Sequence, residues 1–280
     1  MAAERPAALA DTALADPLMS EPTLALPDDP ASRVSMFGAV LPERLRLATT
    51  PIGIGVVLVL LWLWIRARHL DAIERRTLNG DYVRTAIAQH LTLTFVAAGL
   101  VVAIAVPLGV LLTRSWARRL TPFVLALANA GQAVPAIGLL VLLTIKFGVG
   151  FRIALIGLVA SSVLPVLRNT IAGVQQVDQA LVEAARGMGL RPWQVLLRVE
   201  LPLAVPVMLA GLRTALVLCV GVATLATFVD AGGLGDMIIN GLKLQRTAVQ
   251  ITGGLLTCSI AFFVDWLGNV AEWILRPRGI

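Results

Sequence analysis

The chain contains 280 residues, of which 58% are hydrophobic and 14% are charged, and its mean hydropathy is +0.84. Soluble domains are about half apolar and about a quarter charged, so this composition excludes a soluble globular enzyme and indicates a helical protein with several membrane spans. The formal charge of +6 comes mainly from arginines set between apolar stretches, which is typical of membrane-flanking charges and not of a nucleic-acid-binding face.

Residues 1–46 hold seven acidic residues and four arginines without a sustained apolar period, which predicts a flexible tail. They lack the basic start, early apolar run and cleavage site of a signal peptide, so the first hydrophobic run is expected to remain as an anchor. Residues 47–84 are then an N-terminal membrane anchor and an external loop. His69 and His90 are too isolated for a metal or proton-relay site, and each is interpreted as an interfacial polar residue.

Six apolar runs follow one another and predict an all-α integral membrane protein. A helix needs about 20 residues to cross the hydrocarbon core, so the second, third and fifth runs are long enough, while the fourth and sixth are short. Pro107, Pro135 and Pro165 predict kinks or breaks, and Cys219 and Cys258 are interpreted as small buried hydrophobes. The runs cover residues 48–65, 91–113, 123–145, 151–167, 203–229 and 248–264.

The connections between these runs bear on orientation. With a cytoplasmic N-terminus, the inside segments hold thirteen lysines and arginines and the outside segments hold nine. The positive-inside rule therefore favours this orientation weakly, and it places the long connection after the fourth run in the cytoplasm.

That connection, residues 168–202, predicts two short helices outside the bilayer. Asp178 is placed to cap the first helix, Gly189 offers a stop, and Pro192 suits the first turn of the second. Leu181, Ala184, Ala185 and Met188 fall at helical spacing on one face, with Glu183 and Arg186 on another. A hairpin with a small-residue face and a charged face is what a partner protein could bind.

One charge lies deep inside an apolar run, and another lies at the end of the last run. Arg213 is a functional candidate because an intramembrane charge is costly, and a structural or gating role is favoured over direct substrate contact. Asp265 lies beside Trp266 near the end of the last span, which favours an interfacial position.

The glycine-rich run at residues 231–235 lacks the lysine and the Ser or Thr of a phosphate-binding loop, and no strand precedes it. It is interpreted as a tight re-entrant or gate-side turn that contacts an external protein. No Ser/His/Asp arrangement and no H-E-x-x-H pair occurs in the sequence, so neither catalysis nor a metal site is expected.

One motif carries a family resemblance. Glu183-Ala184-Ala185 is followed by three residues, Gly189, nine residues, and Val199-Glu200-Leu201-Pro202. This arrangement resembles the EAA loop of permease subunits in binding-protein-dependent ABC importers. Flanking segments resemble the osmoprotectant branch, whose permeases carry glycine betaine, carnitine, choline or proline betaine. They are residues 89–93, 107–109, 113–114, 131–132 with Pro135, 164–170 and 231–236.

The resemblance implies a type I ABC importer permease fold, with five core transmembrane helices at residues 85–270 and one additional N-terminal helix. A cytoplasmic C-terminal tail would occupy residues 271–280. The coupling loop, residues 178–202, would dock into a partner ATPase through Glu183, Ala184, Ala185, Gly187, Gly189, Leu201 and Pro202. Pathway or gate candidates are Gln132, Pro135, Arg213, Gly232, Gly233 and Gly235.

The resemblance also implies partners, since the chain lacks a Walker A motif and cannot itself hydrolyse ATP. Two cytoplasmic ATP-binding subunits would use ATP and Mg, while this chain holds no cofactor. A second permease, identical or paralogous, and an external substrate-binding protein complete the expected complex in the cell membrane. ATP binding would then open the pathway outward as a population shift.

Other functions stay open at this point. The cargo of such an importer could instead be methionine, an alkylsulfonate or another small solute, because no aromatic cage for a quaternary ammonium group is evident. An ATP-independent channel or secondary transporter is a more distant alternative, and it would be favoured by internal repeats and several intramembrane charges, which the sequence does not display.

Overall fold

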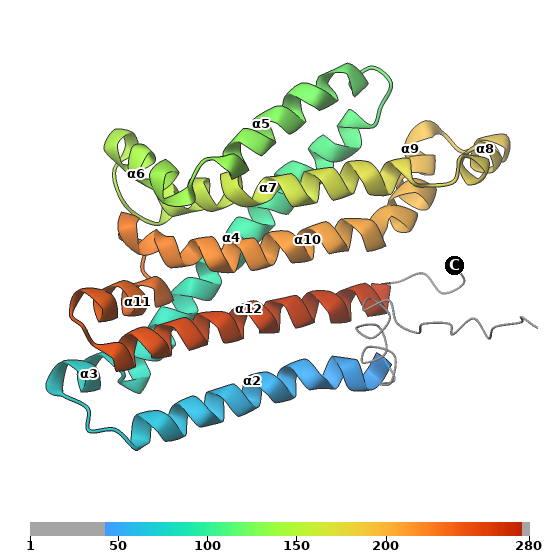
Figure 1. The fold of residues 1–280 in the computed structure, drawn as a ribbon. Coiled ribbons are helices and arrows are strands. Elements are labelled where there is room, and N and C mark those ends of the chain that lie inside the picture. The colour runs from blue at the N-terminus through green and yellow to red at the C-terminus, as the bar shows by residue number, and fades with distance from the viewer. Residues whose placement is uncertain (1–42, 276–280) are drawn as a thin grey trace, which may run out of the picture. The chain divides into compact units, whose positions relative to one another are not determined.

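The structure is a computed structural model that describes the backbone of residues 43–275 and the side chains of residues 48–275. Most of the predicted tail at residues 1–46 and the last five residues of the chain therefore lie outside the described residues. Within residues 43–275, the secondary structure is entirely helical (Figure 1).

Fourteen helical segments make up this part of the chain. The long helices are α2 (Glu43–Arg66), α4 (Gly80–Leu112), α7 (Phe151–Gln175), α10 (Leu201–Ala223) and α12 (Thr247–Leu275). The shorter segments are α3 (Ala72–Thr77), α5 (Thr121–Ala133), α6 (Ala136–Phe147), α8 (Gln179–Gly187), α9 (Pro192–Val195), a π-helical turn (Leu196–Glu200) and α11 (Leu234–Lys243). Short 3-10 turns at Arg118–Leu120 and Thr224–Val229 precede α5 and follow α10.

Five helical stretches within the described residues are long and apolar enough to cross a membrane. Each corresponds to one predicted run. The two runs that are short in sequence, at residues 151–167 and 248–264, belong to helices of 25 and 29 residues. They are longer than their apolar runs because the helices continue through polar side chains such as Arg168 and Asp265.

The predicted third span is not a single helix. Helices α5 and α6 meet at a bend of 94°, and together they are long and apolar enough to form one broken span or a re-entrant loop. The predicted break at Pro135 is therefore confirmed. Val134 precedes proline and takes an extended conformation (φ −68°, ψ 129°), because the proline ring disfavours the helical conformation of the preceding residue. By contrast, α4 and α7 continue through Pro107 and Pro165.

The long helices pack side by side in the order α7, α10, α12 and α2, while α4 crosses them and contacts both α7 and α10 (Figure 1). Small residues permit the close approach of these helices. A Cβ atom on Gly211 of α10 would lie 2.8 Å from the carbonyl oxygen of Pro165 on α7. Helices α8 and α9 lie at one end of this array, and α3 and α11 lie at the other (Figure 1).

Two side chains differ in burial from what the sequence suggests. His90 is fully buried, since α4 begins ten residues earlier and places it against the turn at Gly233. Cys219 is buried as predicted, but Cys258 is exposed on α12. The described residues contain no group of three or more His, Cys, Asp or Glu side chains that could hold a metal ion.

Candidate functional site

Helix α8 begins at Gln179, directly after Asp178, which the sequence predicts as its cap. The Oδ1 atom of Asp178 accepts a hydrogen bond of 2.9 Å from the backbone N–H of Ala180. This contact satisfies one of the backbone donors that lack an intrahelical partner in the first turn. The prediction that Asp178 caps the first helix of the hairpin is therefore confirmed.

The faces of α8 differ from the predicted pattern. Val182 and Ala185 are buried, and they pack with Val195 and neighbouring apolar residues into a small cluster within the hairpin. Leu181 and Met188 are exposed to 49% and 75%. Glu183, Ala184 and Gly187 are exposed as well. Ala184 and Ala185 thus belong to different faces, and the apolar surface open to a partner is formed by Leu181, Ala184 and Met188.

A glycine turn ends α8, as predicted. Gly189 has a left-handed backbone conformation (φ 83°), which side-chain-bearing residues disfavour. Its N–H donates to the carbonyl oxygen of Arg186, and the N–H of Leu190 donates to that of Ala185. These two bonds form a Schellman motif, which satisfies carbonyl groups at the helix end.

The second helix of the hairpin is not separate. Helix α9 passes through the π-helical turn directly into α10, so the predicted short helix is the first part of a longer one. Leu201 and Pro202 lie in the first turn of α10. Pro202 has no N–H, and its ring crowds the carbonyl group four residues earlier. The preceding turn is widened accordingly, since the N–H of Leu201 donates to the carbonyl oxygen of Leu196, five residues back.

A buried carboxylate lies at this turn. The side chain of Glu200 is 8% exposed, and its Oε2 atom lies 2.5 Å from the Nη2 atom of Arg114, just beyond the end of α4. The Nε atom of Arg114 also donates to the hydroxyl of Thr113 at 3.2 Å. The Glu200–Arg114 ion pair links the base of the hairpin to α4, and a buried carboxylate requires such a partner.

Two of the pathway candidates lie at the bend between α5 and α6. Gln132 is in the last turn of α5, Pro135 immediately precedes α6, and both are exposed. Gly131 allows α5 to approach α7, since a Cβ atom there would lie 2.9 Å from the carbonyl oxygen of Ala160. Gln132 and Pro135 therefore lie on the surface of the described residues, while the adjacent Gly131 packs α5 against α7.

The glycine-rich turn lies at the opposite end of the helices from the hairpin. Gly232 and Gly233 have positive φ angles of 75° and 103°, and the Gly233 N–H donates to the Oε1 atom of Gln89 at 3.0 Å. A Cβ atom on Gly235 would lie 2.0 Å from the carbonyl oxygen of Thr224. The turn thus packs tightly against α4 and the end of α10, and it borders a polar cavity of about 320 Å³ lined also by Tyr82 and Asp236.

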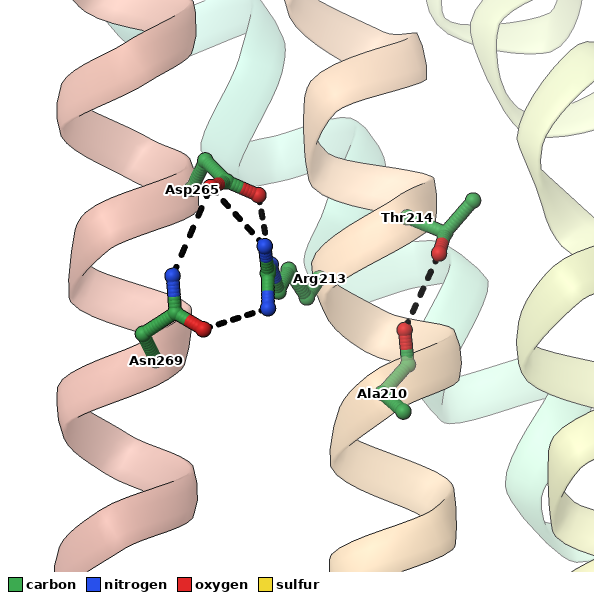
Figure 2. Close-up of polar contacts among 5 residues, drawn as sticks. All are labelled: Ala210, Arg213, Thr214, Asp265 and Asn269. Atoms are coloured by element: carbon green, nitrogen blue, oxygen red, sulfur yellow. Dashed lines mark hydrogen bonds and ion pairs between the residues drawn. The ribbon is translucent and has the colours of Figure 1, made fainter. Parts of the chain in front are cut away.

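Arg213 and Asp265 form an ion pair between α10 and α12 (Figure 2). The Nε and Nη2 atoms of Arg213 lie 2.5 and 3.0 Å from the two carboxylate oxygens of Asp265. The Nη1 atom donates to the amide oxygen of Asn269, which in turn donates to Asp265. The sequence predicts an intramembrane role for Arg213 and an interfacial position for Asp265, but it does not reveal that one is the partner of the other.

The structure therefore separates the predicted site residues into distinct regions. The coupling candidates gather at the α8–α9 end, the glycine candidates lie at the other end, and Arg213 lies between them within α10. Glu200, Arg114 and Asp265 are not among the predicted site residues. The sequence offers Glu200 and Arg114 as positions within the resembling segments and Asp265 as a charge at a span end, but pairings between residues 86 and 52 positions apart are not evident from spacing.

Comparison with known families decides what these regions belong to. Residues 105–272 match the model of the binding-protein-dependent transport system inner membrane component. The chain belongs to this family. As a binding-protein-dependent transport system inner membrane component it is a multi-pass, non-catalytic permease of an ABC transporter, which functions with an ATPase and a binding protein.

Relatives of this inner membrane component are transport permeases. It is 39% identical over 200 residues to the carnitine transport permease protein OpuCD of Listeria monocytogenes, which covers 71% of this chain and 89% of that protein. It is 36% identical over 206 residues to the glycine betaine/carnitine/choline transport system permease protein OpuCD of Bacillus subtilis, covering 72% and 89%. These relatives confirm the osmoprotectant resemblance found in the motifs.

A solved structure confirms the fold. A chain of the MetNI methionine ABC transporter, in inward-facing conformations, aligns with a TM-score of 0.61 and 25% identity, and it covers 70% of this chain and 96% of that chain. The predicted all-α permease fold is therefore correct.

Proposed function

We propose that this chain is the permease subunit of an importer that moves a compatible solute, such as glycine betaine, carnitine or choline, into the cytoplasm. The proposed cargo rests on the cargo of the relatives, which are permeases for carnitine and for glycine betaine, carnitine and choline. A separate pair of ATP-binding subunits, which use ATP and Mg, drives transport. A second permease, identical or paralogous, supplies the other half of the pathway.

The observation that carries this proposal is the exposed hairpin at one end of the helices. Leu181, Ala184 and Met188 on α8 and Trp193 on α9 present apolar side chains away from the rest of the described residues. A protein partner that covers this surface, which lies outside the long helices, would bury apolar area, and an ATPase groove is such a partner. The hairpin and the N-terminus are then cytoplasmic.

The mechanism follows from how the hairpin is attached. Its second helix continues into α10, and its base is tied to α4 by the Glu200–Arg114 ion pair. A displacement of the hairpin on ATPase closure would therefore be passed to α10 directly and to α4 through this pair. Gly232, Gly233 and Gly235 lie at the opposite, external end, where a loaded binding protein would dock.

Uptake into proteoliposomes tests the proposal. The permease is reconstituted with its cognate ATP-binding subunits, its partner permease and binding protein, and the uptake of labelled glycine betaine, carnitine and choline is measured. We expect uptake that requires both ATP and the binding protein. Uptake without ATP would favour a channel or secondary transporter, and uptake of methionine alone would favour the alternative cargo.

A deletion in the hairpin tests its proposed role in coupling the ATPase to transport. Deletion of residues 183–189 should abolish uptake while binding-protein docking is retained. Uptake that survives this deletion would overturn the coupling role.

A further inference from the structure

A polar cavity of about 600 Å³ lies where the hairpin meets the ends of α4 and α7. Its lining includes Thr113 to Trp116, which follow α4, Gln175 at the end of α7, and Gln179 and Arg186 of α8. Glu200 lies within the same lining. The cavity thus occupies the joint between the hairpin and the membrane-spanning helices.

The charges that line this cavity do not balance. Arg114, Arg118 and Arg186 are the guanidinium groups in its lining, and Glu200 is the carboxylate. Glu200 is paired with Arg114. Within residues 48–275, the side chains of Arg118 and Arg186 form no hydrogen bond or ion pair. Two exposed guanidinium groups that line the cavity therefore remain without a partner, and together they attract anions.

The donors in the cavity suit a phosphate group. Each guanidinium group can form two parallel hydrogen bonds to phosphate oxygens, a geometry that is both strong and specific. The amides of Gln175 and Gln179 and the hydroxyl of Ser115 supply further donors around the same space. Glu200, the carboxylate in the lining, is already paired with Arg114. It therefore does not compete with a bound anion for Arg118 and Arg186.

The position of the cavity suits a phosphate at the membrane surface. Two membrane-spanning helices end beside it, and Trp116, which is 69% exposed, lies on its rim. Tryptophan is enriched at the level of lipid headgroups, where basic pockets between helices bind anionic lipids.

We propose that this cavity binds a phosphate-bearing anion through Arg118 and Arg186. The phosphate is supplied by an anionic phospholipid headgroup or by soluble phosphate, and the bound anion bridges the hairpin to the segment between α4 and α5. The inference goes beyond the proposed function, because it is tested by binding and does not depend on which solute is transported.

Native mass spectrometry of the delipidated full chain tests lipid binding. Phosphatidylglycerol and zwitterionic phosphatidylcholine are added separately, and the thermal unfolding midpoint is measured in inorganic phosphate and in chloride of equal ionic strength. Retention of phosphatidylglycerol over phosphatidylcholine identifies a lipid site, and stabilisation by inorganic phosphate alone identifies a soluble anion. The proposal is overturned if neither probe binds better than its control.

Matched variants locate the site. In Arg118→Gln/Arg186→Gln, affinity for the bound probe should fall about tenfold or more, because charge-assisted hydrogen bonds are lost. Arg119→Gln/Arg198→Gln removes the same charge from exposed residues outside the cavity lining and should bind normally. Equal loss in both variants would overturn the assignment, as would loss of the probe when the ATP-binding subunits assemble, since a protein would then fill the cavity.

Arg118→Lys/Arg186→Lys keeps both positive charges, and it distinguishes loss of anion binding from a folding defect. We expect it to retain part of the affinity and to elute with the monodisperse profile of the unaltered chain. If both the lysine and the glutamine variants bind as the unaltered chain does, the arginines do not form the site.

Discussion

Gly187 and Gly189 differ in one physical property, and this permits a controlled test at the level of single residues. Neither would bring a Cβ atom within 4 Å of another atom, but only Gly189 has a positive φ. Gly189→Ala should destabilise the hairpin by about 1–2 kcal/mol, because a left-handed conformation is costly for alanine. Gly187→Ala lies in α8 and should be neutral or stabilising by about 0.5–1 kcal/mol.

The effect of these glycine variants is local to the hairpin, so its readout is binding of the ATP-binding subunits to the purified permease. Gly189→Ala should weaken that binding more than Gly187→Ala does, because only position 189 adds backbone strain to the extra methyl group. If both variants weakened binding equally, the loss would come from the added methyl group at the interface and not from backbone strain.

The Arg213–Asp265 pair is expected to stabilise the contact between α10 and α12. Arg213 lies about 18 Å along α10 from its first residue, at 1.5 Å per residue, so a lone charge there would be held within the membrane. Either Arg213→Met or Asp265→Leu should cost about 1–3 kcal/mol, because the remaining charge loses its partner. The double variant should recover much of that loss, as measured by thermal unfolding in nanodiscs.

Thr214 provides the control for this pair. Its hydroxyl donates to the carbonyl oxygen of Ala210 within α10 and makes no link between helices (Figure 2). Thr214→Val should therefore leave the unfolding midpoint almost unchanged. Strictly additive effects of Arg213→Met and Asp265→Leu would contradict a direct interaction between the two side chains.

At the level of elements, the π-helical turn joins the hairpin to α10 and carries the contact with α4. Such turns are frequent at functional sites. Glu200→Gln should leave ATP hydrolysis by the assembled complex largely intact and lower the number of solutes moved per ATP by about tenfold, the scale of one charge-assisted hydrogen bond. Uptake and hydrolysis are measured in the same proteoliposomes.

Exchange of the two charges separates this transmission role from a folding role. Glu200→Arg/Arg114→Glu should restore part of the coupling, whereas Arg119→Gln, which removes an exposed charge nearby, should have no effect. A parallel fall in uptake and hydrolysis in Glu200→Gln would contradict transmission through the ion pair and indicate loss of assembly.

The positions, ends and buried faces of the helices could be predicted from the sequence to different extents. Apolar runs predict where spans occur, but not where they end, because α7 and α12 continue through Arg168 and Asp265 once neighbouring helices satisfy these polar groups. The cap at Asp178 and the turn at Gly189 are local and were predictable. The inward face of α8 was not, since it depends on Val195 across the hairpin, and periodicity alone does not identify the partner surface.

The candidate site shows the same division between local and distant information. The coupling candidates lie within one stretch, residues 183–202, so a motif was sufficient to find them. Glu200 and Arg114 come from segments that only the fold brings together, and the same is true of Arg213 and Asp265. Pairing energies of this kind depend on burial and distance, neither of which a single sequence supplies.

At the level of the whole molecule, the described residues form two structurally different ends joined by long apolar helices. One end carries the hairpin and the Glu200–Arg114 pair. At the other, Arg246 before α12 lies 2.8 Å from Asp71 before α3, which ties the loop after the N-terminal helix to the core. Helix α2 itself packs against α12 and exposes most of its apolar side chains, as expected for a helix surrounded by lipid.

This arrangement makes a definite prediction about topology. If the hairpin is cytoplasmic, a cysteine at Gln176 should resist a membrane-impermeant maleimide in intact cells, and a cysteine at Arg76 on α3 should react. Both side chains are exposed, so accessibility depends on the side of the membrane and not on burial. The background variant is Cys258→Ser, because Cys258 is exposed whereas Cys219 is buried.

Permeabilisation completes the experiment, since it should make the cysteine at position 176 reactive without changing the reaction at position 76. The reverse pattern in intact cells would place the hairpin outside. It would then separate the hairpin from any ATP-driven partner, because ATP-binding subunits and their nucleotide are in the cytoplasm. Labelling at position 76 alone would instead support a cytoplasmic N-terminus and hairpin. The count of lysines and arginines, thirteen inside and nine outside, favours this orientation only weakly.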